Sequence, residues 1–279
     1  MSKKITIFSV AWFGLFFVEN VVATGLPIQS RGAQPVHIEA DEVTYDQDNS
    51  LAIGSGNAFV QKGDQMVYGD ILTAYFRPKK TSHGGDEGEK EIWKVVAKGH
   101  VRIVTPTGKG FGEDGEYNLD KGSIVLKGHG LKAVSGQGTV LAKDSLEYML
   151  STNQIIARGD AIVKKEDQVL RAPLVTAYFH ENEQNELVFS HAVAKGGAIL
   201  NNSGQIAQGN EAYYDTTTEE TILSGSVRVT EGSRQLRGEH GSFDSKTGVS
   251  RVVNTKAQNV GTRSNDSRVQ VLLYSKRAS

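Results

Sequence analysis

An internal repeat, marked by a glycine at the centre of each strand-like segment, constrains the fold of this chain more than any other feature. The segment KVVAKGHVRIV (94–104) alternates apolar and polar residues around Gly99, as a half-buried strand does. Similar segments are centred on Gly56, Gly128, Gly159, Gly196 and Gly225. Glycine weakens a strand and usually marks a bulge or a close approach, so its recurrence predicts that each strand bends at this point.

Aromatic residues that follow a short acidic or small-residue stretch form a second marker. They are Tyr45, Tyr75, Tyr117, Tyr148, Tyr178, Tyr214 and Phe243. In four cases the central glycine follows 11 residues later, and the next aromatic residue follows 18 to 20 residues after the glycine. Polar insertions at 77–91 and 181–187 lengthen two of the intervals and are predicted to be surface loops. The repeat is therefore about 30 residues long and contains two strands and two turns.

Period-two alternation assigns an inward face to each repeat. In the segment 94–104 the inward residues are Val95, Ala97, Gly99, Val101 and Ile103. The same register applies around Gly159 and Gly225, whereas near Gly128 the frame slips by one residue at Gly130, which predicts a bulge. Two roles for the central glycines stay open. They bend the strands, as glycine kinks do in curved sheets, or they act with inward alanines to keep a lengthwise apolar slot unfilled.

Composition indicates a globular, exported protein. The 279 residues are 38% hydrophobic and 23% charged, and 31 glycines with 5 prolines indicate many turns. A formal charge of -1 lacks the basic footprint of nucleic-acid binding, so we expect no nucleic-acid partner. There is no cysteine, so stability has to come from the core and from strand pairing.

The first residues resemble a secretory signal. A basic lead precedes an uncharged apolar run at 5–18, and Val21 and Ala23 fit a cleavage site. We therefore expect a signal peptide at 1–23, a linker at 24–35 and a periplasmic mature protein. The alternative is a retained membrane anchor, although the apolar run is shorter than the ~20 residues of a spanning helix.

Two stretches resemble a known family. PVHIEADEVTYDQDNSLAIGSGNAFVQKGDQMVYGDILTAYF (35–76) and LSGSVRVTEGSRQLRGEHGSFDSKTGVSRV (223–252) are similar to the N-terminal unit and the C-terminal repeat of the OstA-like (LptA/OstA) lipopolysaccharide transport proteins. The resemblance implies an all-β fold over 36–260, a twisted β-jelly roll of stacked antiparallel strands that is open at both ends. The basic tail at 261–279 has no clear counterpart in that family.

The resemblance also implies a function. Family members carry lipopolysaccharide across the periplasm, with its acyl chains in an apolar interior, from the inner to the outer membrane. The implied partners are lipopolysaccharide, LptC-like inner-membrane and LptD-like outer-membrane components, and further copies in a head-to-tail homo-oligomer. Edge strands near 36–45 and 249–260 would make these contacts, the second with Asn254 where the repeat predicts a glycine.

The alternation selects candidate lipid-binding residues. The apolar candidates are Ile38, Ala40, Ala58, Val60, Val101, Ile103, Ala161, Val163, Val227 and Val229, and the edge aromatics are Tyr75, Tyr117, Tyr148 and Tyr178. Exposing lipid chains costs about 0.8 kcal/mol per CH₂, so a carrier needs a continuous apolar trough and no reaction. Plain core packing is the alternative role for each of these residues.

Other function classes find less support in the sequence. An anchored LptC-like component of the same system is one alternative, and an extracytoplasmic polysaccharide-acting β-helix enzyme or adhesin is another. The histidines are scattered, and there is no cysteine nucleophile or G-x-S-x-G elbow. We therefore expect no enzymatic activity, no catalytic residue, no metal site and no cofactor.

Overall fold

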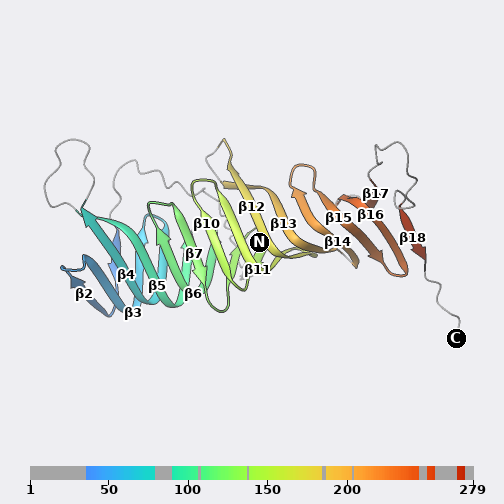
Figure 1. The fold of residues 1–279 in the computed structure, drawn as a ribbon. Helices are drawn as coiled ribbons and strands as arrows, with labels where there is room; N and C mark the ends of the chain where they lie inside the picture. Colours follow the sequence, from blue (N-terminus) through green and yellow to red (C-terminus); the bar gives the residue numbers. More distant parts are fainter. Residues whose placement is uncertain are drawn as a thin grey trace, which may run out of the picture.

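The computed structural model describes residues 36–78, 90–105, 108–136, 138–183, 187–202, 204–244, 250–254 and 269–273. The expected signal peptide and linker at 1–35 lie outside the described residues, as does most of the 77–91 insertion. The described secondary structure consists of β-strands (Figure 1). None of the described residues forms a helix that is long and apolar enough to cross a membrane.

The strands follow one another along the chain with short connections. They are β1 (His37–Glu39), β2 (Glu42–Asp46), β3 (Leu51–Lys62), β4 (Gln65–Pro78), β5 (Lys90–Thr105), β6 (Gly108–Asn118), β7 (Ser123–Lys127), β8 (Lys132–Ser135), β9 (Gly138–Leu141), β10 (Ser145–Met149), β11 (Gln154–Lys165), β12 (Gln168–Glu181), β13 (Leu187–Asn202), β14 (Gln205–Asp215), β15 (Glu220–Glu231), β16 (Arg234–Asp244), β17 (Ser250–Val253) and β18 (Gln270–Leu273).

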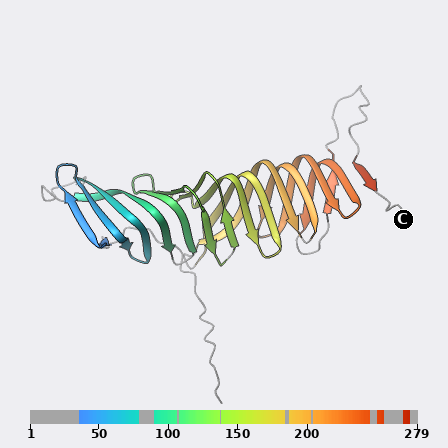
Figure 2. The same ribbon diagram turned by 90° about the horizontal axis from the view of Figure 1, so that it is seen from below.

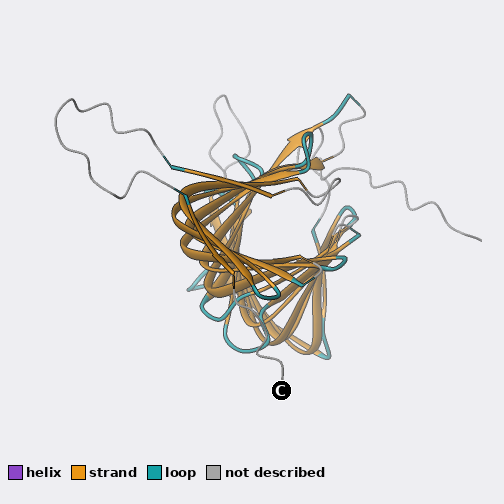
Figure 3. Cartoon of the chain, turned by 90° about the vertical axis from the view of Figure 1, so that its right-hand side faces the viewer, coloured by secondary structure: helices purple, strands orange, loops and turns teal. Residues whose placement is uncertain are grey.

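Long strands bend in the middle and contribute to two antiparallel layers. The first layer contains β2, β7, β10 and β17, and the second contains β1, β8, β9 and β18. Strands β3 to β6 and β11 to β16 run through both layers. Figure 2 shows the strands stacked along the long axis, and Figure 3, viewed from one end, shows the layers facing each other. The predicted all-β jelly roll of stacked antiparallel strands is confirmed.

The bends lie in a line that we call the ridge. It is formed by Gly56, Gly99, Gly159, Gly196 and Gly225, which all have positive φ. The pairing register shifts at each of these positions, for example between Lys98 and Val101. Glycine adopts positive φ without steric cost, and an extra residue at a bulge bends and twists the strand. The central glycines therefore bend the strands.

The expectation that these glycines face inward is wrong. A Cβ at Gly99 would overlap the exposed side chain of Asp70 on the neighbouring strand, and one at Gly225 would meet Asn210. The bulge turns the glycine toward the outside of the bend, while Ala97 and Val101 on either side stay buried. The interruption at Gly128 is larger than the predicted single bulge, because β7 and β8 are separate strands.

Small side chains fill the narrow space inside the ridge, where the two layers converge. Buried alanines flank the bends, among them Ala58, Ala97, Ala157, Ala161, Ala172, Ala194, Ala198, Ala207 and Ala212. Larger core residues lie beside or beyond them, including Leu72, Leu126, Leu146, Leu200 and Leu223. Alanine predominates at the bends, and Val101 and Val227 are the larger residues that are fully buried there.

The C-terminal end differs from the prediction. The expected last strand at 249–260 ends at Val253, and β17 pairs only with the first-layer half of β16. The second-layer half of β16 pairs instead with β18, which comes from the segment expected to be a tail. Residues 255–268 between them lie outside the described residues. Both layers therefore end on a strand paired to β16.

Candidate functional site

The two layers face each other with uninterrupted apolar rows. In the second layer, one inward residue from every strand is directly paired with the next: Ile38, Val60, Val67, Ile103, Gly110, Ala133, Val140, Val163, Leu170, Leu200, Ala207, Val229, Leu236 and Val271. At the strand spacing of 4.7–4.9 Å this row is about 60 Å long. It contains no polar side chain.

The first layer carries a matching row. Its members are Val43, Gly54, Leu72, Ala97, Gly115, Leu126, Leu146, Ala157, Val175, Ala194, Ala212, Leu223, Gly241 and Val252. We call the two rows together the inner rows. They run from the β1–β2 end of the molecule to the β17–β18 end. Such a surface can hold a long apolar ligand and offers no group for covalent chemistry.

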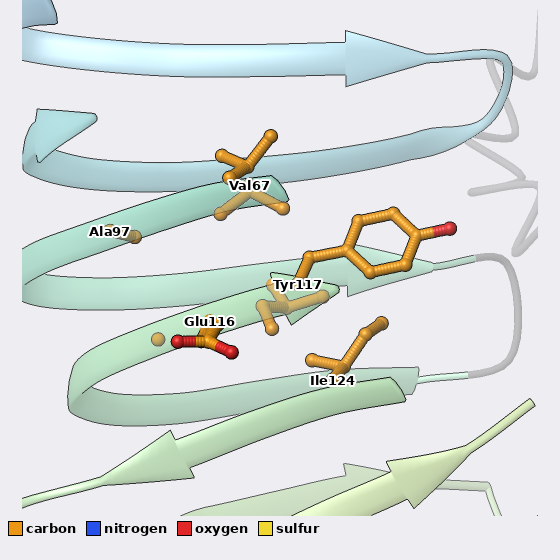
Figure 4. A pocket seen from close by; sticks show the side chains of 8 residues that line it. Val67, Ala97, Glu116, Tyr117 and Ile124 are labelled. Atoms are coloured by element: carbon orange, nitrogen blue, oxygen red, sulfur yellow. The ribbon is translucent and has the colours of Figure 1, made fainter. Parts of the chain in front are cut away.

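A small opening between the layers lies in the N-terminal half (Figure 4). It encloses about 250 Å³, part of it open to solvent, and is lined by Val67, Val95, Ala97, Ile103, Gly115, Glu116, Tyr117 and Ile124. Members of both inner rows, Val67 and Ala97, line it together with Tyr117.

The apolar candidates predicted from the sequence fall into two groups. Ile38, Val60, Ile103, Val163 and Val229 belong to the second-layer inner row. Ala58, Val101, Ala161 and Val227 are at most 1% exposed beside the ridge, and Ala40 packs there against the same core. In the first group Val60, Ile103 and Val229 are buried and Ile38 and Val163 are half-buried, whereas the second group packs the bend.

The aromatic candidates divide by face. Tyr117 and Tyr148 face the interior, where burial raises the pKa of both hydroxyls, that of Tyr148 to about 12 with a further contribution from Glu181. Both phenols therefore stay neutral at ordinary pH, and the inner surface gains no charge from them. Tyr117 pairs with Ile124 and Ile124 with Tyr148, which forms an apolar rim beyond the first inner row.

Tyr75 and Tyr178 lie on the outer face, so their expected place in the trough is wrong. The Lys94 ammonium lies 4.3 Å from the Tyr75 ring centroid, and Tyr178 stacks on His191 with centroids 4.3 Å apart. Register irregularities between Tyr75 and Phe76 and between Tyr178 and Phe179 change the alternation. Phe76 packs against the core instead. The repeated pair Tyr-Phe was the available signal, because two adjacent aromatics normally occupy opposite faces.

Ion pairs on the outside brace neighbouring strands. Asp160, beside the ridge glycine of β11, accepts bonds from Nε and Nη2 of Arg171 at 2.5 and 2.6 Å and lies 2.7 Å from Nζ of Lys143. The hydrogen bond from Arg171 and then that from Lys143 hold the pKa of the carboxyl well below its ordinary value. Within the described ranges, no group of three or more His, Asp or Glu side chains is arranged to hold a metal ion.

Comparisons with known proteins agree with this geometry. The family model described as LptA/(LptD N-terminal domain) LPS transport protein matches residues 37–144 and 139–249. An uncharacterized protein, R00383 of Rhizobium meliloti (strain 1021), is 28% identical over 113 residues, which cover 40% of this chain and 58% of that protein. The chain therefore matches a little over half the length of this relative.

Among solved structures, the chain is similar to LptH, the LptA homologous periplasmic component of the lipopolysaccharide transport device of Pseudomonas aeruginosa. The match covers 87% of this chain and 96% of LptH at 11% identity, with a TM-score of 0.21. The two family-model matches, in contrast, together span most of the described jelly roll. This chain belongs to the LptA/(LptD N-terminal domain) family of lipopolysaccharide transport proteins.

Proposed function

We propose that this protein is a periplasmic bridge that carries the lipid A acyl chains of lipopolysaccharide between its layers, from the inner to the outer membrane. The observation that carries the proposal is the pair of inner rows, which continue without a polar side chain from one end of the jelly roll to the other. Export through the expected signal peptide at 1–23 would place the mature chain in the periplasm.

The inner rows meet the main energetic requirement of such a carrier. Each acyl CH₂ exposed to water costs about 0.8 kcal/mol, so a lipid with several chains needs cover along its whole path. A single charged residue in the rows would place a barrier on that path, because burying an unpaired charge is costly. Since every strand of a layer contributes an apolar residue or glycine to the row of that layer, an acyl chain can shift along the molecule between similar environments.

The ends of the molecule favour head-to-tail joining. At the N-terminal end the chain passes from β1 in the second layer to β2 in the first layer. At the C-terminal end it passes in the opposite direction, from β17 in the first layer to β18 in the second. A second copy whose β1–β2 end meets this β17–β18 end would therefore continue antiparallel pairing in both layers with the ridges aligned. Inward residues at these ends are uncovered: Val43 is 55% and Val271 57% exposed. Pairing would cover them, and the same edges suit LptC-like and LptD-like partners by β-augmentation.

A site-specific crosslinking experiment tests the proposal. A photoreactive phenylalanine analogue is placed at Val67, which faces the opening, or at its neighbour Tyr68, which faces outward. Irradiation of cells should join lipopolysaccharide to the Val67 variant, and the Tyr68 variant should give little product. Equal labelling at the two positions, or lipopolysaccharide on neither, would contradict transport between the layers.

A further inference from the structure

A ladder of aromatic and cationic residues crosses the outer face of the second layer in the N-terminal half of the chain. It consists of Phe59 on β3, Tyr68 on β4, Arg102 on β5, Phe111 on β6 and Lys132 on β8. Each residue is the direct cross-strand partner of the next. We call these five residues the basic-aromatic ladder. They lie on the face opposite the inner rows and take no part in the proposed lipid path.

Charge on this part of the outer face has one sign. At the outward positions of the second layer from β3 to β9, the charged residues are Arg102, Lys109 and Lys132. All three are exposed. Among the described residues none of the three forms an ion pair, whereas other cations such as Arg77 and Arg171 do.

Acids lie at the margins of this face. Glu39 on β1, the cross-strand partner of Phe59, lies 2.8 Å from His37, Asp64 is exposed in the β3–β4 turn, and on the ridge Asp70 contacts His100 at 2.8 Å. The outer face of the first layer differs, because there Asp114 is the cross-strand partner of both Lys98 and Lys127. From β3 to β9 the outward strand positions of the second layer therefore carry positive charge without an acid among them, whereas those of the first layer carry both signs.

Two of the three aromatic rings contact their cross-strand neighbours. The Arg102 guanidinium carbon lies 4.1 Å from the centroid of Tyr68, and the Phe59 and Tyr68 centroids are 5.7 Å apart with their planes tilted by 36°. Arg102 therefore covers one face of the Tyr68 ring. The opening in Figure 4 lies between the layers and not on this face. Because the ladder spreads its rings and cations over five strands, a broad partner with spread negative charge fits it best.

We infer that the basic-aromatic ladder docks the N-terminal half of the protein on an anionic phospholipid surface. Lys and Arg are attracted to anionic headgroups within about a Debye length, ~10 Å at 0.1 M salt. Tyr favours the headgroup region because its ring is apolar and its hydroxyl is wet, and Phe side chains bury their rings at the boundary between headgroups and acyl chains. Docking through the outer face leaves the interior free, so this contact goes beyond the proposed function and does not depend on it.

Vesicle sedimentation with the purified protein tests the inference. Vesicles of phosphatidylglycerol and phosphatidylcholine in equal parts are compared with vesicles of phosphatidylcholine alone. The protein should bind the anionic vesicles, bind the neutral ones little, and dissociate as salt is raised. The triple variant Arg102→Glu, Lys109→Glu and Lys132→Glu should bind the anionic vesicles about tenfold or more weakly.

A matched control distinguishes loss of the basic-aromatic ladder from a general change in the net charge of the protein. Lys98→Glu, Lys127→Glu and Lys195→Glu change the charge equally on the outer face of the first layer and should leave vesicle binding nearly unchanged. Circular dichroism checks the fold of each variant, and if the triple variant fails to fold, Lys109→Gln with Lys132→Gln should still weaken binding. Equal loss in both sets, equal binding to both vesicle types, or binding to a soluble acidic polysaccharide without binding to vesicles would overturn the inference.

Discussion

Gly99 on β5 lies directly against the side chain of Asp70 on β4, with φ of +72°, so that a Cβ at this position would overlap the carboxylate. His100 follows with φ of +49° and contacts the same carboxylate through Nδ1 at 2.8 Å. Asn57 and Asp41 repeat the arrangement, with Nδ2 of Asn57 donating to Asp41 at 2.9 Å. At four ridge positions a left-handed glycine thus lies against a polar side chain of the neighbouring segment, and at Gly196 that place is taken by Pro173.

Replacing Gly99 by Ala should lower the free energy of unfolding. The left-handed conformation costs a non-glycine residue about 1–2 kcal/mol, and Asp70 must also move. Urea denaturation measures the change. Gly136→Ala is the control, because a Cβ there meets nothing within 4 Å. Equal unfolding free energies for the two variants would show that the ridge does not need its glycine.

Asp160 should make stability depend on pH in the acid range. Its folded-state pKa is lowered, chiefly by Arg171, so its contribution is present above the unfolded-state pKa of about 3.9 and is lost as pH falls below that value. Asp160→Asn should therefore be less stable than the parent at pH 7, with a difference that shrinks in acid. Denaturation at a series of pH values measures this. A difference that does not change with pH would contradict the ion-pair account, and Asp167→Asn in an exposed turn serves as the control.

Tyr148 should make the stability of the fold depend on pH in the alkaline range. Its folded-state pKa is raised to about 12, above the ordinary value of about 10, so its contribution is complete below pH 10 and is lost as pH rises through 12. In Tyr148→Phe the fall in stability over this interval should be shallower. Tyrosinate absorbance of the two proteins should locate the late-titrating phenol. If the absorbance that Tyr148→Phe loses belongs to titration near pH 10 and not near pH 12, Tyr148 lies in water.

Head-to-tail assembly should depend on the free edge of β2. The amide of Asp41 donates to Gly56, and antiparallel pairing alternates, so the amide of Thr44 points away from β3. Thr44→Pro should therefore block pairing with another copy and leave the β2–β3 pairing intact. Analytical ultracentrifugation at increasing concentration should show oligomers only for the parent.

A cysteine pair gives an independent check on that contact. Continuing the first-layer inner row from Val252 of one copy to Val43 of the next places Thr44 opposite Arg251. The chain has no cysteine of its own, so Thr44→Cys on one copy and Arg251→Cys on another should form disulfide-linked dimers when mixed. Each single variant alone supplies the control. Oligomers that persist in Thr44→Pro, together with no crosslink between the mixed variants, would refute edge pairing of β2 with β17.

The sequence by itself determined the strands, their repeat and most of the inner surface. Alternation is a local property with a period of two, so Ile103 and Val163 could be assigned to the interior from their neighbours alone. The same holds for Tyr117 and Tyr148, which lie at regular positions. These residues needed no knowledge of which strand lies beside them.

Only the tertiary structure decided where alternation breaks and what lies across each strand. A bulge at the ridge turns Gly99 outward. The register irregularity after Tyr75 leaves Tyr75 on the outer face and Phe76 against the core. Pairing of β18 with β16, across residues distant in sequence, replaced the expected continuation of β17. The position of a bulge depends on the register between two strands. The segment that pairs with an edge strand is the one that forms the most favourable contacts with it. Both depend on contacts between distant residues, which a local pattern does not contain.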